Sequence, residues 1–321
     1  MSARTRIGGQ AVPEGVMLRG SRGWAVAVRR PDGEIVVRRQ ALRARMGWSL
    51  HRVPLLRGLL MLFAALPLGV RALLWASSQA GGHTTDELQR TRGRRAMVNA
   101  VTLVFGLAFA WFLFGWLPAA AARVVTSQVT AAAWVEAIFR IGAIGLYIAL
   151  LNLLPSVRRV FGYHGAEHQV VGAYEAGLEV TPASAANFPR LHPRCGSTFV
   201  VLLALCHALL RGFVPASIPG GSVVRALALP ISIMIAFELL SLGAQKPGTW
   251  WTRALLSPGT ALQRLTTRPA SHDQLEVACV ALNAVLSLEQ SSLEDHDQQQ
   301  DDQQQDEQTA TYVHGASLRV S

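Results

Sequence analysis

The run from Ala96 to Ala122 contains no charged residue, and it constrains the fold more than any other part of the chain. About 20 consecutive apolar residues in a helix are enough to cross the hydrocarbon core of a bilayer. Arg92, Arg94 and Arg95 come directly before the run, and arginine is typical of the cytoplasmic flank of a span. The pattern therefore predicts a transmembrane helix that begins in the cytoplasm.

Three further segments are predicted to cross the membrane, which makes the chain a mainly α-helical, polytopic membrane protein with about four transmembrane helices. The first two spans follow one another within residues 96–154. Glu136 and Arg140 of the second span have the spacing of a helical ion pair. The other two spans follow one another within residues 196–245. An even number of spans, with arginine-rich segments on one side, places both termini in the cytoplasm.

Residues 54–76 are also apolar, but Arg57, Pro67 and Arg71 interrupt them. The stretch between the two arginines is too short to cross about 30 Å of hydrocarbon. It therefore predicts a helix that lies at the membrane interface or re-enters it. This helix and a basic linker occupy residues 54–95. The residues before position 54 are therefore treated as a separate element.

That N-terminal element, residues 1–53, is predicted to be a small cytoplasmic unit that contains β-structure. Residues 24–40 contain two β-rich runs on either side of Pro31-Asp32-Gly33. Proline and glycine in this order are typical of a tight turn, so a β-hairpin is expected.

The C-terminal part of the chain divides into two segments of different character. Residues 246–290 are predicted to hold a cytoplasmic amphipathic helix, because 275–290 have helical apolar spacing after the helix-start signal Ser271-His272-Asp273. This helix is expected to pack on the N-terminal element. Residues 291–321 are acidic and rich in glutamine, and they are predicted to be disordered.

The net charge of +10 comes almost entirely from arginine, with Lys246 as the single lysine. These basic residues flank apolar runs, so the lipid bilayer is the expected partner and nucleic acid is not. A homo-oligomer or a membrane-protein partner stays open. The chain has three cysteines, a small and odd number that does not predict a disulfide framework.

The chemistry of the chain is concentrated in the segment YHGAEHQVVGAYE, residues 163–175. In a helix, His164, Glu167 and His168 share one face. The order H-x-x-E-H lets two imidazoles hold one divalent ion while the carboxylate acts as general base. We therefore expect His164 and His168 as metal ligands and Glu167 as the catalytic residue.

A second motif, RLHPRCG at residues 190–196, offers two more ligands, His192 and Cys195. An H-x-x-C turn around a proline directs nitrogen and sulfur toward one point, as a zinc knuckle does. An apolar cap on the third span is the alternative role of Cys195. Residues 155–195 are thus predicted to form a cytoplasmic metal-motif loop.

Two carboxylates are further candidates for a ligand or for a hydrogen bond to a ligand histidine. Glu238 lies inside the predicted fourth span, where an unpaired carboxylate is costly and usually functional. Glu175 follows His168 by two helical turns on the same face.

Several of these stretches together resemble the YqhQ-like family of uncharacterised bacterial membrane proteins, described as predicted metal-dependent enzymes. The resemblance extends over roughly residues 7–287 and implies a location in the bacterial inner membrane. It also implies that Glu14 stands at a motif position, beside Pro13, where the family is usually aliphatic. Glu14 is therefore a third candidate for a ligand or for a hydrogen bond to a ligand histidine. The stretches that carry it, in order, are GGQAVPEGVMLRG, PDGEIVV, YHGAEH, RLHPRCGSTF and SPGTALQRLTTRP, and they include His164, Glu167, His168, His192 and Cys195.

Two functional hypotheses follow from these residues. The first is a membrane metalloprotein with a divalent metal, zinc if the thiolate binds it, that acts as a hydrolase at the cytoplasmic boundary. The second is a non-enzymatic membrane scaffold or assembly factor in which the metal is structural. A transporter ranks third, because four spans supply few polar groups for a pathway. The sequence predicts no substrate.

Overall fold

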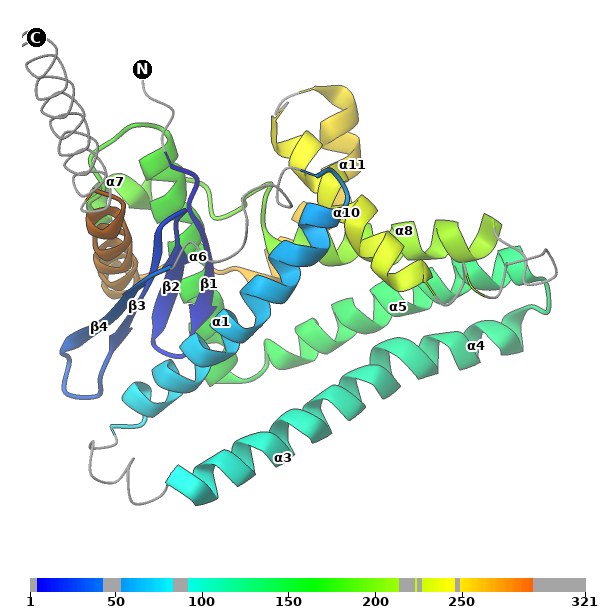
Figure 1. Cartoon of the computed structure of the whole chain (residues 1–321), viewed down its shortest axis with the longest axis horizontal. Coiled ribbons are helices and arrows are strands. Elements are labelled where there is room, and N and C mark those ends of the chain that lie inside the picture. Colours follow the sequence, from blue (N-terminus) through cyan, green and yellow to red (C-terminus); the bar gives the residue numbers. More distant parts are fainter. Residues whose placement is uncertain are drawn as a thin grey trace, which may run out of the picture.

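The computed structural model describes residues 5–42, 53–82, 92–213, 223, 227–245 and 249–290. Within these residues the protein is mainly helical, with one small antiparallel sheet (Figure 1). The predicted disordered tail, residues 291–321, lies outside the described residues. The sheet stands at one end of the molecule, and a bundle of long apolar helices extends from it.

The sheet contains four strands in the order β1-β2-β3-β4. The predicted hairpin is confirmed as β3 with β4, and Gly33 in its turn has a φ of 92°. Strands β1 and β2 form a second hairpin, in which Glu14 has a φ of 55°. This second hairpin was not predicted from the sequence. The strands are β1 (Gly8–Val12), β2 (Gly15–Arg19), β3 (Gly23–Arg29) and β4 (Ile35–Ala41).

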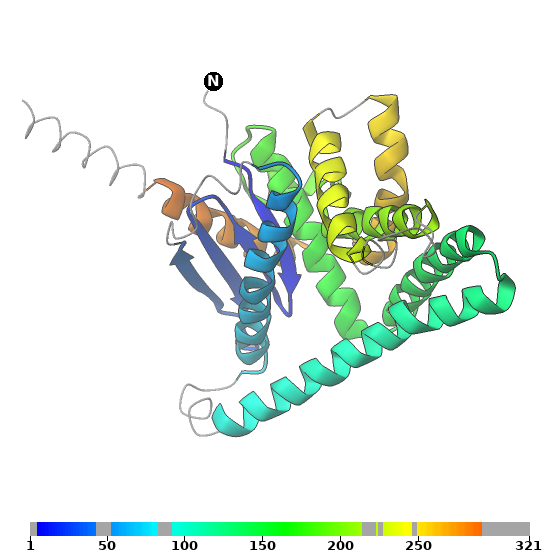
Figure 2. The same ribbon diagram turned by 45° about the vertical axis from the view of Figure 1, so that its right-hand side comes forward.

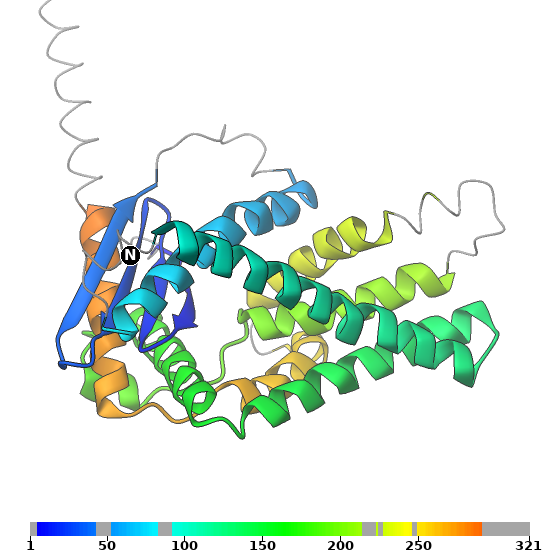
Figure 3. The ribbon, with the colours of Figure 1, turned by 90° about the horizontal axis from the view of Figure 1, so that it is seen from below.

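Helices cover both faces of the sheet (Figures 2 and 3). One face packs against α6 (Pro155–Glu175) and a C-terminal helix over residues 272–290. The opposite face packs against the second half of α1 (Leu56–Ala80). Alternation along the strands explains both layers, because Val16 and Leu18 belong to the first core while Met17, between them, belongs to the second.

The C-terminal helix begins where the sequence predicts and packs on the N-terminal sheet as expected. The backbone N–H of Gln274 donates to Ser271 Oγ at 3.4 Å, and Ser271 N–H donates to Gln274 Oε1 at 3.1 Å. These reciprocal bonds form a capping box. The first and last described parts of the chain therefore share one hydrophobic core.

Five helices among the described residues are long and apolar enough to cross a membrane, which indicates a membrane protein. At most 39% of the most apolar window of any of them is buried inside the protein, so lipid is the natural cover for the remainder. The five are α1, the continuous helix Ala96–Val125, the helix Ala131–Leu151 within α5 (Val129–Leu151), α8 (Gly196–Phe213) and α10 (Ala228–Gln245).

Helix α1 is the one that the sequence analysis did not count as a span. It is a single helix of 25 residues that contains Pro67. Arg57 does not limit the length of the helix, because the Nε of Arg57 donates to Glu238 Oε1 of α10 at 2.7 Å. The helix therefore extends beyond the stretch between the two arginines, and a distant carboxylate neutralises one of them.

The long helix Ala96–Val125 is built from α3 (Arg92–Trp111), a π-helical turn η2 (Phe112–Trp116) and α4 (Leu117–Val125). Helix α4 packs on α5, whereas α3 runs away from the rest of the bundle (Figure 1). Helices α5, α10 and the shorter α11 (Trp250–Thr266) pack around α8. The start of α8 and the end of α11 lie next to α6, and this junction positions the candidate site.

Candidate metal centre

Helix α6 carries the H-x-x-E-H motif, so part of the predicted loop is a buried helix. Leu154 is extended before it, and Pro155 occupies its first turn, where no N–H is needed. A Cβ on Gly165 would lie 2.1 Å from the carbonyl oxygen of Arg268. Glycine inside the motif thus allows the chain after α11 to approach α6, where Arg268 N–H donates to Phe161 O at 2.9 Å.

The two motif histidines are oriented by backbone carbonyl groups. His164 Nδ1 lies 2.8 Å from Thr266 O, and His168 Nδ1 lies 2.6 Å from Arg190 O. A carbonyl oxygen only accepts hydrogen bonds, so each Nδ1 carries the proton in this arrangement. In the neutral ring Nε2 then keeps its lone pair, and this is the form in which a histidine binds a metal.

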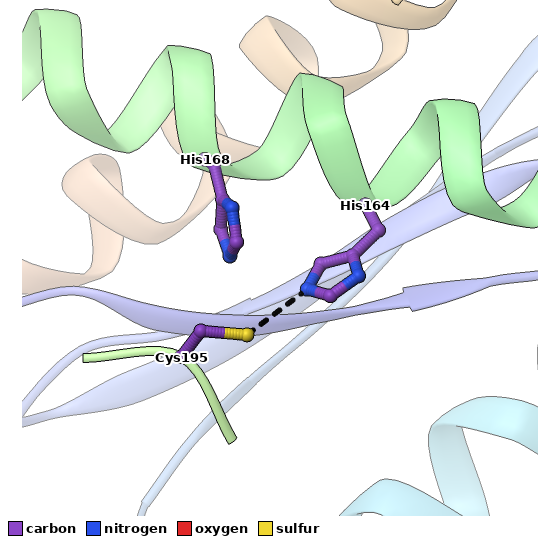
Figure 4. A group of neighbouring side chains, drawn as sticks. All are labelled: His164, His168 and Cys195. Carbon is purple, nitrogen blue, oxygen red and sulfur yellow. Dashed lines mark hydrogen bonds between the residues drawn. The ribbon is translucent and has the colours of Figure 1, made fainter. Parts of the chain in front are cut away.

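Cys195, the residue before α8, points toward these imidazoles. Its Sγ lies 3.3 Å from His164 Nε2, and the side chain is buried. Figure 4 shows His164 and His168 projecting from one helix toward the sulfur. One donor atom from each of the three residues lies within 4.8 Å of the other two. We refer to His164, His168 and Cys195 as the trio.

Glu167 lies beside the trio in a site almost sealed from solvent. Its Oε2 is 3.4 Å from His168 Nε2, and its side chain is 8% exposed. Burial raises the pKa of Glu167, while His164, His192 and Arg194 pull it in the opposite direction. A Cβ on Gly9 would lie 2.8 Å from Glu167 Oε1, so glycine in β1 lets the strand close over the carboxylate.

His192 faces the same space but is held differently. The backbone N–H of Arg194 donates to His192 Nδ1 at 3.3 Å, so the proton of the neutral ring sits on Nε2. Nε2 lies 3.5 Å from Glu175 Oε2, and Arg194 pairs with the same carboxylate. Burial lowers the pKa of His192, while Glu167 pulls it upward. His192 is not a member of the trio.

These side chains surround a cavity of about 250 Å³ between α6, β1 and the turn before α8. One wall is formed by β1 and the residue before it, and it supplies small or apolar groups together with the amide of Gln10. The other walls are mainly polar, with Val171 as an apolar member. The titratable residues that line the cavity are His164, Glu167, His168, His192, Arg194 and Cys195.

Comparison with known proteins identifies the family. A family model described as "Protein of unknown function (DUF1385)" matches residues 53–288. The chain belongs to this family. The Uncharacterized protein YqhQ of Bacillus subtilis (strain 168) is 32% identical over 297 residues, which cover 89% of this chain and 93% of that protein. No solved structure matches the chain. The resemblance to a YqhQ-like family is thus confirmed, and the family description assigns no activity.

Two carboxylates that the sequence placed near the metal are held elsewhere in this DUF1385 protein. Glu14 accepts two hydrogen bonds from Arg159 Nε, at 2.6 and 2.7 Å, in the turn between β1 and β2. Glu238 accepts from Arg57 and from the backbone N–H of Leu55 at 3.0 Å. Neither lines the cavity. Glu175 does not line the cavity either, and it reaches the site through its contacts with His192 and Arg194.

Gln263 of α11 is a positioning residue that the sequence analysis did not single out. Its Oε1 accepts from His192 N–H at 2.8 Å, and its Nε2 donates to His192 O at 2.8 Å and to Thr198 Oγ1 at 3.0 Å. The side chain is fully buried. It therefore fixes the H-x-x-C turn against α8. A lone glutamine in an amphipathic helix gives no signal of this role.

Proposed function

We propose that this DUF1385 protein is an integral membrane metalloprotein in which the trio holds a divalent cation. The observation that carries the proposal is the pair of Nδ1 tethers, which leaves two Nε2 lone pairs beside the Cys195 thiol. Neutral imidazole and thiolate are ligands that Zn²⁺ prefers, and a thiolate disfavours magnesium and calcium. Zinc is therefore the expected metal.

A hydrolase is the activity that this arrangement supports best. Three protein ligands leave one position open in a tetrahedral site, which is the pattern of catalytic rather than structural zinc. A divalent ion there would activate water for attack on an electrophilic substrate. Glu167, with a pKa raised by burial, is placed to accept a proton and to pass it on as a general acid. His192 and Arg194 would supply hydrogen-bond donors to a substrate oxygen.

The first experiment measures metal content per chain of the detergent-purified full-length protein by elemental mass spectrometry. We expect about one zinc per wild-type chain and little in His164→Ala or Cys195→Ser. His272→Ala is the matched control, because His272 is exposed on the C-terminal helix. A folded wild-type protein without metal after reconstitution with zinc would contradict the proposal, as would a His164→Ala variant that keeps its zinc.

The hydrolase is tested with Glu167→Gln, which preserves shape and removes the ionisable group. We expect this variant to retain zinc and to lose a cellular phenotype or a hydrolytic activity that the wild-type chain provides. Loss of general acid–base catalysis costs about 10²- to 10⁴-fold in rate. A Glu167→Gln protein with full activity would refute the catalytic role and leave the metal proposal intact.

A scaffold with a structural metal is the second candidate. It is favoured by the position of the trio, which links α6 to the first turn of α8, while His164 also contacts the end of α11. A metal here would hold α6, the start of α8 and the end of α11 together. In that case His168→Ala lowers the unfolding temperature and abolishes the phenotype, whereas Glu167→Gln changes neither.

We further propose that α1 lies at the membrane interface and that the other four apolar helices cross the bilayer. Because the N-terminal sheet and the C-terminal helix share one core, the chain between them crosses an even number of times. Five crossings would place the two parts of this core on opposite sides of the membrane. Helix α1 buries Leu68, Ala72 and Ala76 against the sheet, so it is the helix that stays on the same side as the sheet. The arginine distribution favours the cytoplasm.

The topology is tested by fusing a fluorescent protein that folds only in the cytoplasm to either end of the full chain. We expect fluorescence from both fusions. Fluorescence from only one end would mean an odd number of crossings and would overturn the interfacial placement of α1.

A further inference from the structure

A second polar cluster lies within the helix bundle, far from the trio. Glu136 of α5 pairs with Arg140 one turn later and accepts two hydrogen bonds from Arg211 Nη1 of α8, both at 3.2 Å. Arg211 is about 24 Å along α8 from Cys195, at 1.5 Å per residue. The cluster therefore belongs to the opposite end of the bundle and is independent of the proposed metal site.

The π-helical turn η2 takes part in this cluster. Arg140 Nε donates to the carbonyl oxygen of Phe114, in the middle of η2, at 2.7 Å. A π-helical turn in a long helix is uncommon and often marks a functional position. Here the carbonyl oxygen of Phe114 accepts a hydrogen bond from the guanidinium of Arg140, so a second carboxylate is not needed to hold this arginine.

A cavity of about 230 Å³ opens beside the cluster. Arg123 at the end of α4 lines it together with Glu136 and Arg211, and Thr126 and Ser127 add hydroxyl groups. Arg123 is exposed and forms no ion pair with any residue that the structure describes. Because Arg140 also pairs with Glu136, three guanidinium groups are balanced by one carboxylate. The cavity therefore has a net positive charge.

Exposed apolar residues, here called the apolar rim, lie within two positions in the sequence of residues that line the cavity. Val124 is 89% exposed and Val125 is 61% exposed, directly after Arg123. Ile138 on α5 is 70% exposed. A positively charged cavity with hydroxyl groups and an apolar rim fits a ligand that has an anionic phosphate and hydrocarbon tails.

We propose that this cavity binds the phosphate group of an anionic phospholipid. The guanidinium groups of Arg123 and Arg211 are planar donors suited to phosphate oxygens, and Thr126 and Ser127 supply additional hydrogen-bond donors. The acyl chains lie along the exposed apolar surfaces of α4 and α5. A free phosphate ion has the same head chemistry, but it would leave the apolar rim uncovered.

The test measures binding of phosphatidylglycerol and phosphatidylcholine to the detergent-purified full-length protein by native mass spectrometry. We expect the wild-type protein to retain phosphatidylglycerol in preference. Arg123→Gln should weaken that binding roughly fivefold, the effect of one arginine at an anionic lipid surface. Arg253→Gln, which removes an exposed arginine from α11, is the matched control and should bind as the wild type does.

Three results would overturn the proposal. Equal retention of the two lipids would remove the preference for an anion. Equal binding by the wild-type protein and Arg123→Gln would exclude this cavity as the place of binding. If inorganic phosphate at the same concentration displaced phosphatidylglycerol completely, the ligand would be a free ion and the lipid assignment would be wrong.

Discussion

The two polar clusters near the ends of α8 differ in what holds their side chains. At the start of α8, His164 and His168 are held by backbone carbonyl groups and keep free lone pairs. Near its end, Glu136 is held by Arg140 and Arg211, so its charge is already compensated. Both clusters combine acidic and basic residue types, yet only the first leaves side-chain lone pairs unused.

The capacity of a side chain to bind a metal therefore depends on its hydrogen-bond partner more than on its residue type. A neutral tether fixes a histidine without consuming the nitrogen that binds a metal. An arginine consumes the carboxylate and leaves extra positive charge, which favours an anion. The predictions below test this contrast by removing first the charged partners and then the neutral ones.

The largest expected effect comes from Glu136→Gln. The replacement leaves Arg140 and Arg211 without their carboxylate in a poorly solvated place, and breaking a buried ion pair costs about 3 to 5 kcal/mol. Thermal unfolding in detergent measures the loss. The matched control is Glu276→Gln, since Glu276 is 47% exposed in its pair with Arg29 and such pairs contribute about 1 kcal/mol or less. Equal losses would show that burial does not separate the two pairs.

The next largest effect is expected from Gln263→Leu. The change removes the hydrogen bond that the His192 N–H donates to Gln263 Oε1 and leaves the His192 carbonyl with only the Cys195 N–H as its partner. An unsatisfied buried polar group costs about 1 to 3 kcal/mol. The H-x-x-C turn should loosen, so zinc binding should weaken together with stability. Metal content and unfolding temperature measure the two effects. Gln245→Leu is the control, because Gln245 is exposed at the end of α10; a similar loss there would contradict the role of Gln263.

Gly165→Ala tests the close approach of α6 to the chain after α11. The new methyl group would meet the backbone of Arg268, which cannot rotate away, and overpacking of this kind costs about 1 to 3 kcal/mol. The same shift would move His164 away from Thr266. Gly142→Ala on α5 is the control, because nothing lies within 4 Å of its Cβ position. An unfolding temperature unchanged by Gly165→Ala would disprove the tight contact.

Most of the fold could be predicted because its signals are local. Long apolar runs gave four of the five apolar helices, and the Pro31-Asp32-Gly33 turn gave the β3–β4 hairpin. Helix α1 was judged too short because the partner of Arg57 is Glu238, which lies far away in the sequence. Hairpin β1–β2 was missed as such because Glu14 rather than glycine adopts the positive φ in its turn.

The candidate site was predictable only in part for the same reason. Positions three and four apart on a helix share a face, so the grouping of His164, Glu167 and His168 follows from the sequence. The backbone carbonyls that orient the histidines have no sequence signature. Glu238 and Glu14 were misplaced because an acid in an apolar or motif position gives no sign of which distant arginine it meets.

The smallest expected effect on stability comes from Glu167→Gln, because the two side chains have nearly the same shape. Burial raises the pKa of Glu167, so the folded chain keeps this proton to a higher pH than the unfolded chain does. The wild-type protein therefore loses stability as pH rises from about 4.3, the pKa of an exposed glutamate, through the folded-state pKa. The Glu167→Gln variant cannot ionise there and escapes this loss.

In metal-free protein, stripped with a chelator, the two unfolding temperatures should therefore coincide near pH 4, and the variant should be the more stable at pH 7. Unfolding at both pH values checks the sign. A variant less stable than the wild type at pH 7 would mean that His164 and Arg194 stabilise the ionised carboxylate more than burial opposes it. Glu167 would then be held by positively charged partners, as Glu136 is, and the contrast between the two clusters would fail.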